Sequence, residues 1–359
     1  MKEGSLLNMT KDMEHIRVSV GFYANWWHKN YGISYGKQYY YDPDYRIEAA
    51  MKQQKILHER FGDLGLGNPN PQPNPFVDYG MALVPEMFGC EITFFDDALP
   101  WAIPANLTEE QVSKLIVPDV LNTYPMTEII KQMDYLEKKY GRVTGNINTC
   151  GILNLALKIR GDQLYTDFYE NPELVHNLMN ICLETIIPLA NYVRGRTGTL
   201  ASSVTPMAPP EMYITPNCTS AQVSNESYEE FVLPYEIKLA NALQPFGIHH
   251  CGSVDNVVEG YSKIKNMQFI EVGPKSDLRR VRELMPNIHI NARICPVRML
   301  QCTAEEIEQD VKHLIDTGGP LELLSIDAVG LDSGTPDENV RAMLNTGKSY
   351  SAAKMAEKK

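Results

Sequence analysis

The sequence contains no long hydrophobic run and no cluster of basic residues. A membrane-spanning helix needs roughly 20 consecutive apolar residues, and residues 1–20 mix both charges instead of forming the apolar core of a secretory signal. The 33 Lys and Arg residues are outnumbered by 45 Asp and Glu residues, which gives a net charge of -12. Because nucleic-acid binding depends on clustered cations, we expect a cytoplasmic protein that binds neither membranes nor nucleic acids.

Cysteine is scarce and follows no disulfide pattern. The chain has 7 cysteines in 359 residues, an odd number that is scattered without the regular spacing of small secreted proteins. We therefore expect reduced thiols. Cys90, Cys150 and Cys182 are expected to pack as small core residues, because free cysteine is among the most buried residue types.

Helix and strand signals alternate from about residue 105 to the C-terminus. Capping boxes predict helices that begin after Thr108, Thr303 and Thr335. Apolar or β-branched runs predict strands at 199–204, 267–272, 288–292 and 321–326. This alternation indicates an α/β fold with a parallel sheet covered by helices, and its persistence to the C-terminus favours a TIM-type (β/α)8 barrel.

Residues 1–80 differ from the rest of the chain. They are rich in tryptophan and tyrosine and end in a proline-punctuated stretch at 68–75, which cannot be helical because proline lacks the amide donor. We expect residues 1–80 to form a mainly helical N-terminal extension packed on the barrel. The barrel itself is assigned to residues 81–348, and residues 349–359 are expected to form a frayed tail.

The segment His249-His250-Cys251-Gly252 carries the strongest functional signal. If it ends a strand, side chains two positions apart share a face, so His249 and Cys251 point together and His250 points away. A neighbouring strand at 288–292 would deliver Cys295 roughly 5 Å away if the two strands pair directly. Zinc accepts such a ligand set and keeps a fourth position open for chemistry. We therefore predict a zinc site formed by His249, Cys251 and Cys295.

Four segments of the chain, in this order, resemble the uroporphyrinogen decarboxylase superfamily over roughly residues 80 to 345. They are Phe88-Gly89-Cys90-Glu91-Ile92, then 145–161 running into 167–176, then 228–235, and finally 249–252. The resemblance implies a single TIM-type barrel with its pocket at the carboxyl ends of the strands, which agrees with the pattern of helices and strands.

Members of this superfamily differ in chemistry. Some decarboxylate porphyrinogens without a cofactor, and others use zinc to move methyl groups to and from the cobalt of a corrinoid. Residues 18–141 contain only Arg46 and Arg60 as arginines, so the arginine-rich signature of the true decarboxylases is not seen. In contrast, His249 and Cys251 lie in a segment similar to the one that supplies the first two zinc ligands in the corrinoid-dependent methyltransferases.

The sequence departs from the methyltransferases that act on coenzyme M. Those proteins place their last cysteine ligand in a segment similar to 324–330, where this chain has no cysteine. Cys295 from another strand end, Asp327 and Cys218 are the candidates for the missing ligand. The departure favours the methyltransferases that demethylate a substrate such as a methyl ether and pass the methyl group to a corrinoid protein.

The sequence therefore predicts a zinc-dependent methyltransferase that moves a methyl group from a small methylated substrate to the cobalt of a separate corrinoid protein. Zinc would stabilise the charge on the leaving oxygen. Three alternatives stay open: a methylcorrinoid:thiol methyltransferase, a metal-free decarboxylase, and a barrel that only binds a tetrapyrrole or corrinoid. No catalytic residue is assigned. The candidates for a substrate pocket lie near predicted strand ends and are Asn148, Asn217, Cys218 and Asp327.

Overall fold

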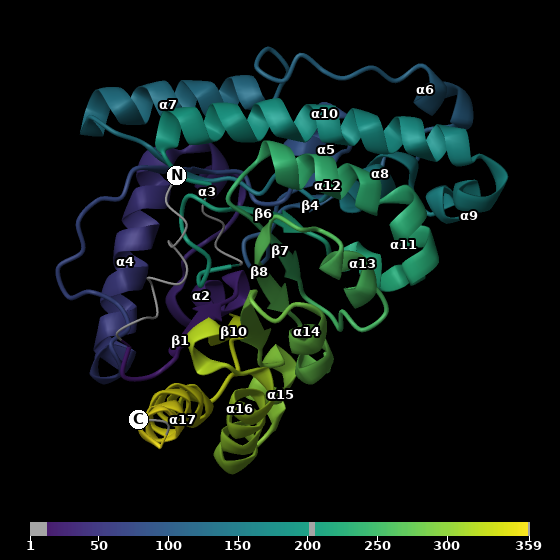
Figure 1. The fold of residues 1–359 in the computed structure, drawn as a ribbon. Helices are drawn as coiled ribbons and strands as arrows, with labels where there is room; N and C mark the ends of the chain where they lie inside the picture. Colours follow the sequence, from purple (N-terminus) through teal and green to yellow (C-terminus); the bar gives the residue numbers. More distant parts are fainter. Residues whose placement is uncertain (1–12, 201–204, 358–359) are drawn as a thin grey trace.

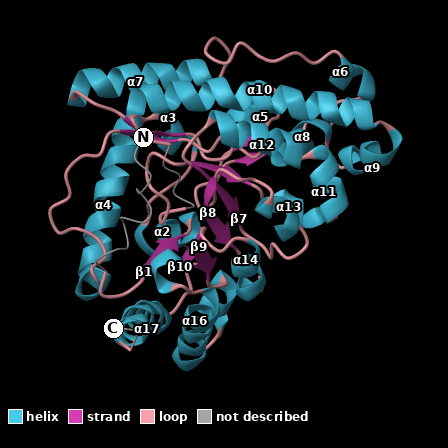
Figure 2. Cartoon of the chain, in the orientation of Figure 1, coloured by secondary structure: helices cyan, strands magenta, loops and turns pink. Residues whose placement is uncertain are grey.

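The computed structural model describes residues 13–200 and 205–357 (Figure 1). Its centre is a six-stranded, fully parallel sheet in the order β1-β10-β9-β8-β7-β6. The strands are β1 (Arg17–Phe22), β6 (Tyr213–Pro216), β7 (Phe246–His250), β8 (Met267–Val272), β9 (His289–Arg293) and β10 (Leu324–Leu331). Helices follow these strands and cover the sheet, as Figure 2 shows.

Two further parallel strands, β2 (Phe76–Asp78) and β5 (Thr144–Asn146), pair with each other. A short antiparallel hairpin is formed by β3 (Ile92–Thr93) and β4 (Trp101–Ala102). Within the described residues, the six-stranded and two-stranded parallel sheets are not joined by ladder hydrogen bonds. The predicted α/β class is confirmed as a TIM-like arrangement in which parallel strands form a half-barrel sheet.

The helices form the outer layer of the molecule. The first group is α2 (Ala24–Tyr31), α3 (Lys37–Tyr41), α4 (Pro43–Phe61), α5 (Leu83–Met87), α6 (Glu109–Ser113), α7 (Met126–Tyr140), α8 (Ile152–Arg160) and α9 (Gln163–Glu170). The second group is α10 (Pro172–Thr197), α11 (Asn225–Phe231), α12 (Leu233–Ala242), α13 (Val258–Ser262), α14 (Leu278–Leu284), α15 (Pro296–Gln301), α16 (Ala304–Gly318) and α17 (Asp337–Ala356).

The region before residue 76 is largely helical, as expected, but it also contributes a strand to the main sheet. Strand β1 pairs with β10 from Arg17↔Ser325 to Val20↔Ala328. The short proline-punctuated stretch leads directly into β2, which also lies before residue 80. The N-terminal segment is therefore interleaved with the sheet and shares one continuous hydrophobic core with it.

The helix ends test the capping boxes. Thr108 and Thr303 form complete boxes with the residues three positions later, as expected. At Thr335 the expectation is wrong, because α17 begins after Pro336 and the Thr335 hydroxyl has no hydrogen-bond partner among the described residues.

Helix α17 continues to Ala356, so residues 349–356 are helical where we expected a frayed tail. Buried Ser351 explains this, since its hydroxyl accepts from the Ile16 amide at 3.1 Å.

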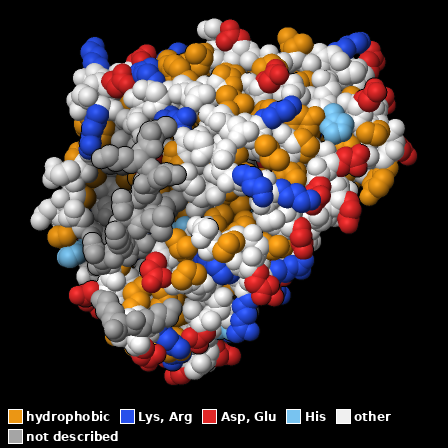
Figure 3. All heavy atoms as spheres, in the orientation of Figure 1, with side chains coloured by type: hydrophobic (Ala, Val, Ile, Leu, Met, Phe, Trp, Pro, Cys, Tyr) orange, Lys and Arg blue, Asp and Glu red, His pale blue; other side chains and the backbone are white. Residues whose placement is uncertain are grey.

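Two further expectations concern strands and membranes. Most of the strand expected at 199–204 lies outside the described residues, because 201–204 are among those not described. In the described ranges, no helix combines the length and the apolar composition that a membrane span requires. Acidic and basic side chains are intermixed over the face drawn in Figure 3.

Candidate metal centre

Strand β7 places its two histidines on opposite faces of the sheet. His249 Nδ1 lies 2.7 Å from Glu271 Oε1 on the neighbouring strand β8, whereas His250 Nδ1 lies 2.8 Å from the hydroxyl of Tyr261 on α13, in the helical layer. This is the alternation that a strand imposes on successive side chains. The prediction that His250 points away from His249 is confirmed.

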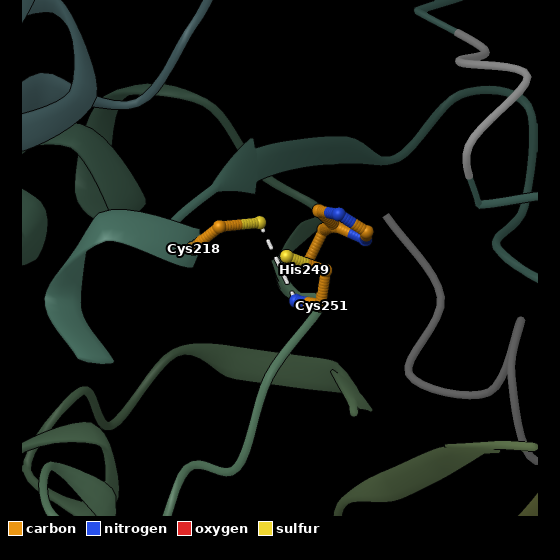
Figure 4. A group of neighbouring side chains, drawn as sticks. All are labelled: Cys218, His249 and Cys251. Carbon is orange, nitrogen blue, oxygen red and sulfur yellow. Dashed lines mark hydrogen bonds between the residues drawn. The ribbon is translucent and has the colours of Figure 1, made fainter. Parts of the chain in front are cut away.

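Three potential metal ligands meet at the carboxyl ends of β6 and β7. Pro216 on β6 is in register with His249 on β7, and Cys218 and Cys251 each follow two positions later. Adjacent strands lie about 4.8 Å apart, so the two thiols extend from equivalent positions of neighbouring strands. One ligand atom each of Cys218, His249 and Cys251 lies within 4.8 Å of the others (Figure 4). The Cys251 amide donates to Cys218 Sγ at 3.4 Å.

The third ligand predicted from the sequence, Cys295, does not belong to this group. Strand β9 pairs with β8 and β10, so β8 lies between β9 and β7, and the expected direct pairing is wrong. Two strand spacings amount to about 10 Å, which separates Cys295 from the other ligands. Cys295 instead precedes α15 and lines a cavity with Val272 and Ile294. Cys218 takes the place that we expected for Cys295.

The two thiols differ in their protonation. The hydrogen bond from Cys218 lowers the pKa of Cys251 to about 6, with help from the charges of His249 and Arg293 and against the effect of burial. The same contact, together with burial, raises the pKa of Cys218. Cys251 is exposed and Cys218 is half-buried. The pair therefore offers one thiolate near neutral pH, and a thiolate is the form that binds soft metal ions.

A buried polar network holds the imidazole of His249. Besides contacting His249, Glu271 accepts from Asn291 Nδ2 at 3.3 Å and pairs with Arg293 Nη1 at 3.3 Å. With Nδ1 directed at the carboxylate, the other ring nitrogen, Nε2, is free to bind a metal ion. Carboxylate–histidine pairs of this kind orient histidine ligands in zinc sites.

The sequence analysis did not identify Glu271, Asn291 or Arg293. The signal that would have found two of them is the alternation along β9, where His289, Asn291 and Arg293 interrupt an otherwise apolar strand at every second position. Such spacing places the three polar side chains on one face. Burying three polar groups requires partners, so the pattern predicts a polar interior.

Asp327, a candidate for the substrate pocket, belongs to the same network. It accepts from Asn291 Nδ2 at 2.9 Å, and its Oδ1 lies 3.8 Å from Arg293 Nε. Burial and the nearby charge of Glu271 raise the pKa of Asp327 well above its usual range. The structure thus places Asp327 in the support of the metal group and not among the three clustered ligand atoms.

The two asparagine candidates lie at strand ends, as expected. Asn217 is fully buried, and its backbone N–H donates to the His249 carbonyl at 2.7 Å, which joins the end of β6 to β7. Asn148 Oδ1 accepts from the Cys150 amide at 2.9 Å. Their contact with a substrate stays a prediction, as does that of Asp327. Cys218, the fourth pocket candidate, lies in the metal group.

The donor set fits zinc. Two thiols and one imidazole are the soft and borderline ligands that zinc binds, and three protein ligands leave a fourth position for a reactant. Hard cations such as Mg²⁺ or Ca²⁺ prefer oxygen ligands, so this group is a poor site for them. The exposed Cys251 thiol places the group within reach of solvent.

Comparisons with known proteins identify the family of this chain. The model of the uroporphyrinogen decarboxylase (URO-D) family matches residues 76–350. The methylcobamide:CoM methyltransferase MtbA of Methanosarcina mazei is 25% identical over 282 residues, which cover 76% of this chain and 79% of the relative. MtbA of Methanosarcina acetivorans is 24% identical over 286 residues with the same coverage.

The likeness extends to a solved structure. A methyltransferase from Methanosarcina mazei matches with a TM-score of 0.66 at 16% identity, and the match covers 96% of each chain. At this identity the likeness supports the fold. The resemblance inferred from the sequence is confirmed by the family match, which spans most of the chain. The protein belongs to the uroporphyrinogen decarboxylase family of enzymes and is a distant homologue of the MtbA corrinoid methyltransferases.

Proposed function

We propose that this protein is a zinc-dependent methyltransferase that moves a methyl group from a small methylated substrate, such as a methyl ether, to the cobalt of a separate corrinoid protein. The observation that carries the proposal is the cluster of Cys218, His249 and Cys251 at the carboxyl ends of β6 and β7. The distant homology to corrinoid methyltransferases supports it.

In this proposal Cys218, Cys251 and His249 Nε2 hold the ion. When bound, zinc supplies Lewis-acid stabilisation to the oxygen that leaves the methyl group. Glu271 fixes the orientation of the His249 ring by accepting a hydrogen bond from its Nδ1. The exposed side of Cys251 leaves an approach from solvent, so both the substrate and the corrinoid would enter at the same end of the sheet.

A second candidate is a methylcorrinoid:thiol methyltransferase. It is favoured by the printed activity of the relatives, which are methylcobamide:CoM methyltransferases. Cys218, His249 and Cys251 already supply one histidine and two cysteines, so the missing cysteine in 324–330 does not count against this candidate. The fourth coordination position of a bound zinc would accept a thiol and hold it as thiolate.

The metal-free decarboxylase alternative needs free cations for a polycarboxylate substrate. Arg293, in the interior of the sheet's carboxyl end, already pairs with Glu271, which disfavours this alternative.

Metal content tests the ligand set. We expect about one zinc per chain in the wild type and in Cys295→Ser, and loss of zinc in Cys218→Ser and Cys251→Ser. Inductively coupled plasma mass spectrometry of the purified proteins measures this directly. If Cys295→Ser loses zinc while Cys218→Ser keeps it, the proposed ligand set is wrong.

Methyl transfer tests the reaction. Reduced cobalamin with a panel of methyl ethers should yield methylcobalamin, which is followed by its absorbance. The thiol-directed alternative predicts demethylation of methylcobalamin by a thiol panel instead. Absence of transfer in both directions with zinc-loaded protein would favour the alternative of a barrel that only binds a corrinoid or tetrapyrrole.

A further inference from the structure

A cavity of about 460 Å³ lies behind the metal centre, between the sheet and its covering helices. Its apolar walls include Val272 from the end of β8, Ile294 from the end of β9, and Leu314 from α16. Helices α14, α15 and α16 lie together at this edge of the sheet (Figure 1). The volume falls within the range of roughly 300–1,000 Å³ that is usual for small-molecule pockets.

The cavity is separate from the metal group. Side chains alternate along a strand, and Glu271 and Asn291 direct theirs into the polar network of the interior. Their neighbours Val272 and Ala292 therefore face the helices, and these two line the cavity. None of the three clustered metal ligands is among the lining residues.

One wall is shared with the metal centre. Arg293 lines the cavity and also contacts Glu271, the partner of His249. Gly273, another lining residue, lies directly against the metal-site segment, because a Cβ added there would meet the carbonyl oxygen of Cys251 at 2.3 Å. A ligand in the cavity would thus lie behind the metal group, on the opposite side of the sheet end.

The rim of the cavity carries two cations, Lys275 and Arg298, against one carboxylate, Asp310, in a chain whose net charge is -12. Arg293 also lines the cavity, but its guanidinium contacts Glu271 and Asp327 on the interior side of the sheet. Arg298 pairs with Asp310 at 2.5 Å, and Lys275 forms no ion pair within the described residues. Lys275 also has φ of 72°, a left-handed conformation that residues with side chains rarely adopt. The turn that positions this lysine is therefore strained.

We propose that this cavity is a binding site for a small amphipathic carboxylate. The apolar chain of the ligand packs between Val272, Ile294 and Leu314, and its carboxylate lies at the cationic rim beside Lys275 and Arg298. Cys295 lines the same cavity and is half-buried, so the thiol that the metal group does not use reports on occupancy of this site. The proposal does not depend on zinc or on methyl transfer.

Calorimetric titration of the full chain with octanoate, and with 1-octanol as the uncharged probe, tests the proposal. We expect octanoate to bind and 1-octanol to bind more weakly. Lys275→Gln should weaken octanoate binding about two- to fivefold, the range for one exposed charge pair. The matched control is Lys265→Gln, an exposed lysine outside the cavity, which should leave the affinity unchanged.

Alkylation locates the bound probe. Iodoacetamide labelling, read at peptide level by mass spectrometry, should be slower at Cys295 when octanoate is present and unchanged at Cys302, which is also half-buried but does not line the cavity. The proposal is overturned if octanoate does not bind, if 1-octanol binds equally well, or if the two lysine variants behave alike. It is also overturned if octanoate fails to slow labelling of Cys295, or if Cys295 is not alkylated in the free protein.

Discussion

Glu271 Oε1 lies 2.7 Å from His249 Nδ1, and both residues are buried. Arg293 Nη1 lies 3.3 Å from the same oxygen, and Asn291 Nδ2 donates to the other carboxylate oxygen, Oε2, at 3.3 Å. An imidazole clamped in this way has one tautomer and one orientation, with Nε2 directed away from the carboxylate. Side chains from three strands, β7, β8 and β9, thus fix the direction of a single ligand atom, His249 Nε2.

Replacing Glu271 tests this clamp. Glu271→Gln keeps the size of the side chain but removes its charge, so we expect zinc affinity to fall roughly 10- to 100-fold, as for other partners of histidine ligands. Competition with a chromophoric chelator measures the affinity. Glu283→Gln, at an exposed position on α14, serves as control and should keep wild-type affinity. Equal affinities in both variants would contradict a positioning role for Glu271.

Gly273→Ala is expected to damage the metal centre through the backbone. The added Cβ would meet the carbonyl oxygens of Cys251 and Gly252 at 2.3 Å each, and backbone atoms cannot rotate away as a side chain can. We expect a loss of about 1–3 kcal/mol in the free energy of unfolding, typical of overpacking, together with weaker zinc binding. Urea denaturation and chelator competition measure the two effects.

The control for this prediction is Gly195→Ala. Gly195 lies inside α10, and an added Cβ there meets no atom within 4 Å. Alanine has the higher helix propensity, so this variant should unfold at the same or a higher urea concentration. If Gly273→Ala behaves like Gly195→Ala, the close approach to Cys251 is not a constraint.

Buried Glu236 on α12 predicts a pH dependence of stability. Burial raises the pKa of Glu236 from 4.5 to about 7, against the effect of the hydrogen bond from Tyr228. Between these two values the folded state binds the proton more tightly than the unfolded state does, so stability falls as pH rises from about 4.5 to about 7. The loss is on the order of 3 kcal/mol. Glu236→Gln should not show this part of the loss.

The measurement is the difference in unfolding free energy between wild type and Glu236→Gln at pH 5 and pH 8. The comparison with the variant is needed because burial lowers the pKa of His250 and of His289 to about 4, and these groups make stability fall as pH drops from about 6.5 to 4. Their contribution is common to both proteins. A difference that does not change with pH would contradict the prediction for Glu236.

Arg46 joins the N-terminal helices to β2, and its loss should destabilise the fold. Its fully buried guanidinium donates to the carbonyl of Phe76 at 3.0 and 3.1 Å, to the carbonyl of Tyr39 at 2.9 Å and to Gln132 Oε1 at 2.9 Å. Arg46→Met leaves these acceptors unpaired, so we expect a loss of about 3 kcal/mol or more. Chemical denaturation measures it. Exposed Arg142→Met is the control and should change stability by less than about 0.5 kcal/mol.

Several strands could be predicted closely from the sequence. The expected strand at 267–272 coincides with β8, and the one at 288–292 differs from β9 by one residue. On β7 the opposite directions of His249 and His250 followed from alternation. These features depend on residues that are close in the sequence, and the period of a strand is the same in any fold.

The missing features depend on contacts between distant residues. Strand β1 was not predicted because RVSVGF is short and becomes a strand by pairing with β10, more than 300 residues later. The length of α17 was underestimated because buried Ser351, which contacts Ile16, stabilises its last turns. In both cases the decisive partner comes from the other end of the chain.

The sequence by itself determined the fold class and the pairing of His249 with Cys251 on one face, because periodicity and local spacing are properties of neighbouring residues. The family followed from the resemblance of four segments to known proteins. Only the tertiary structure decided that Cys218 and not Cys295 completes the cluster. The lateral order of strands is set by how helices pack and cross between them, and this order places β6 directly beside β7 while β8 separates β7 from β9. A thiol two strands away cannot share an ion that the adjacent strand end can bind.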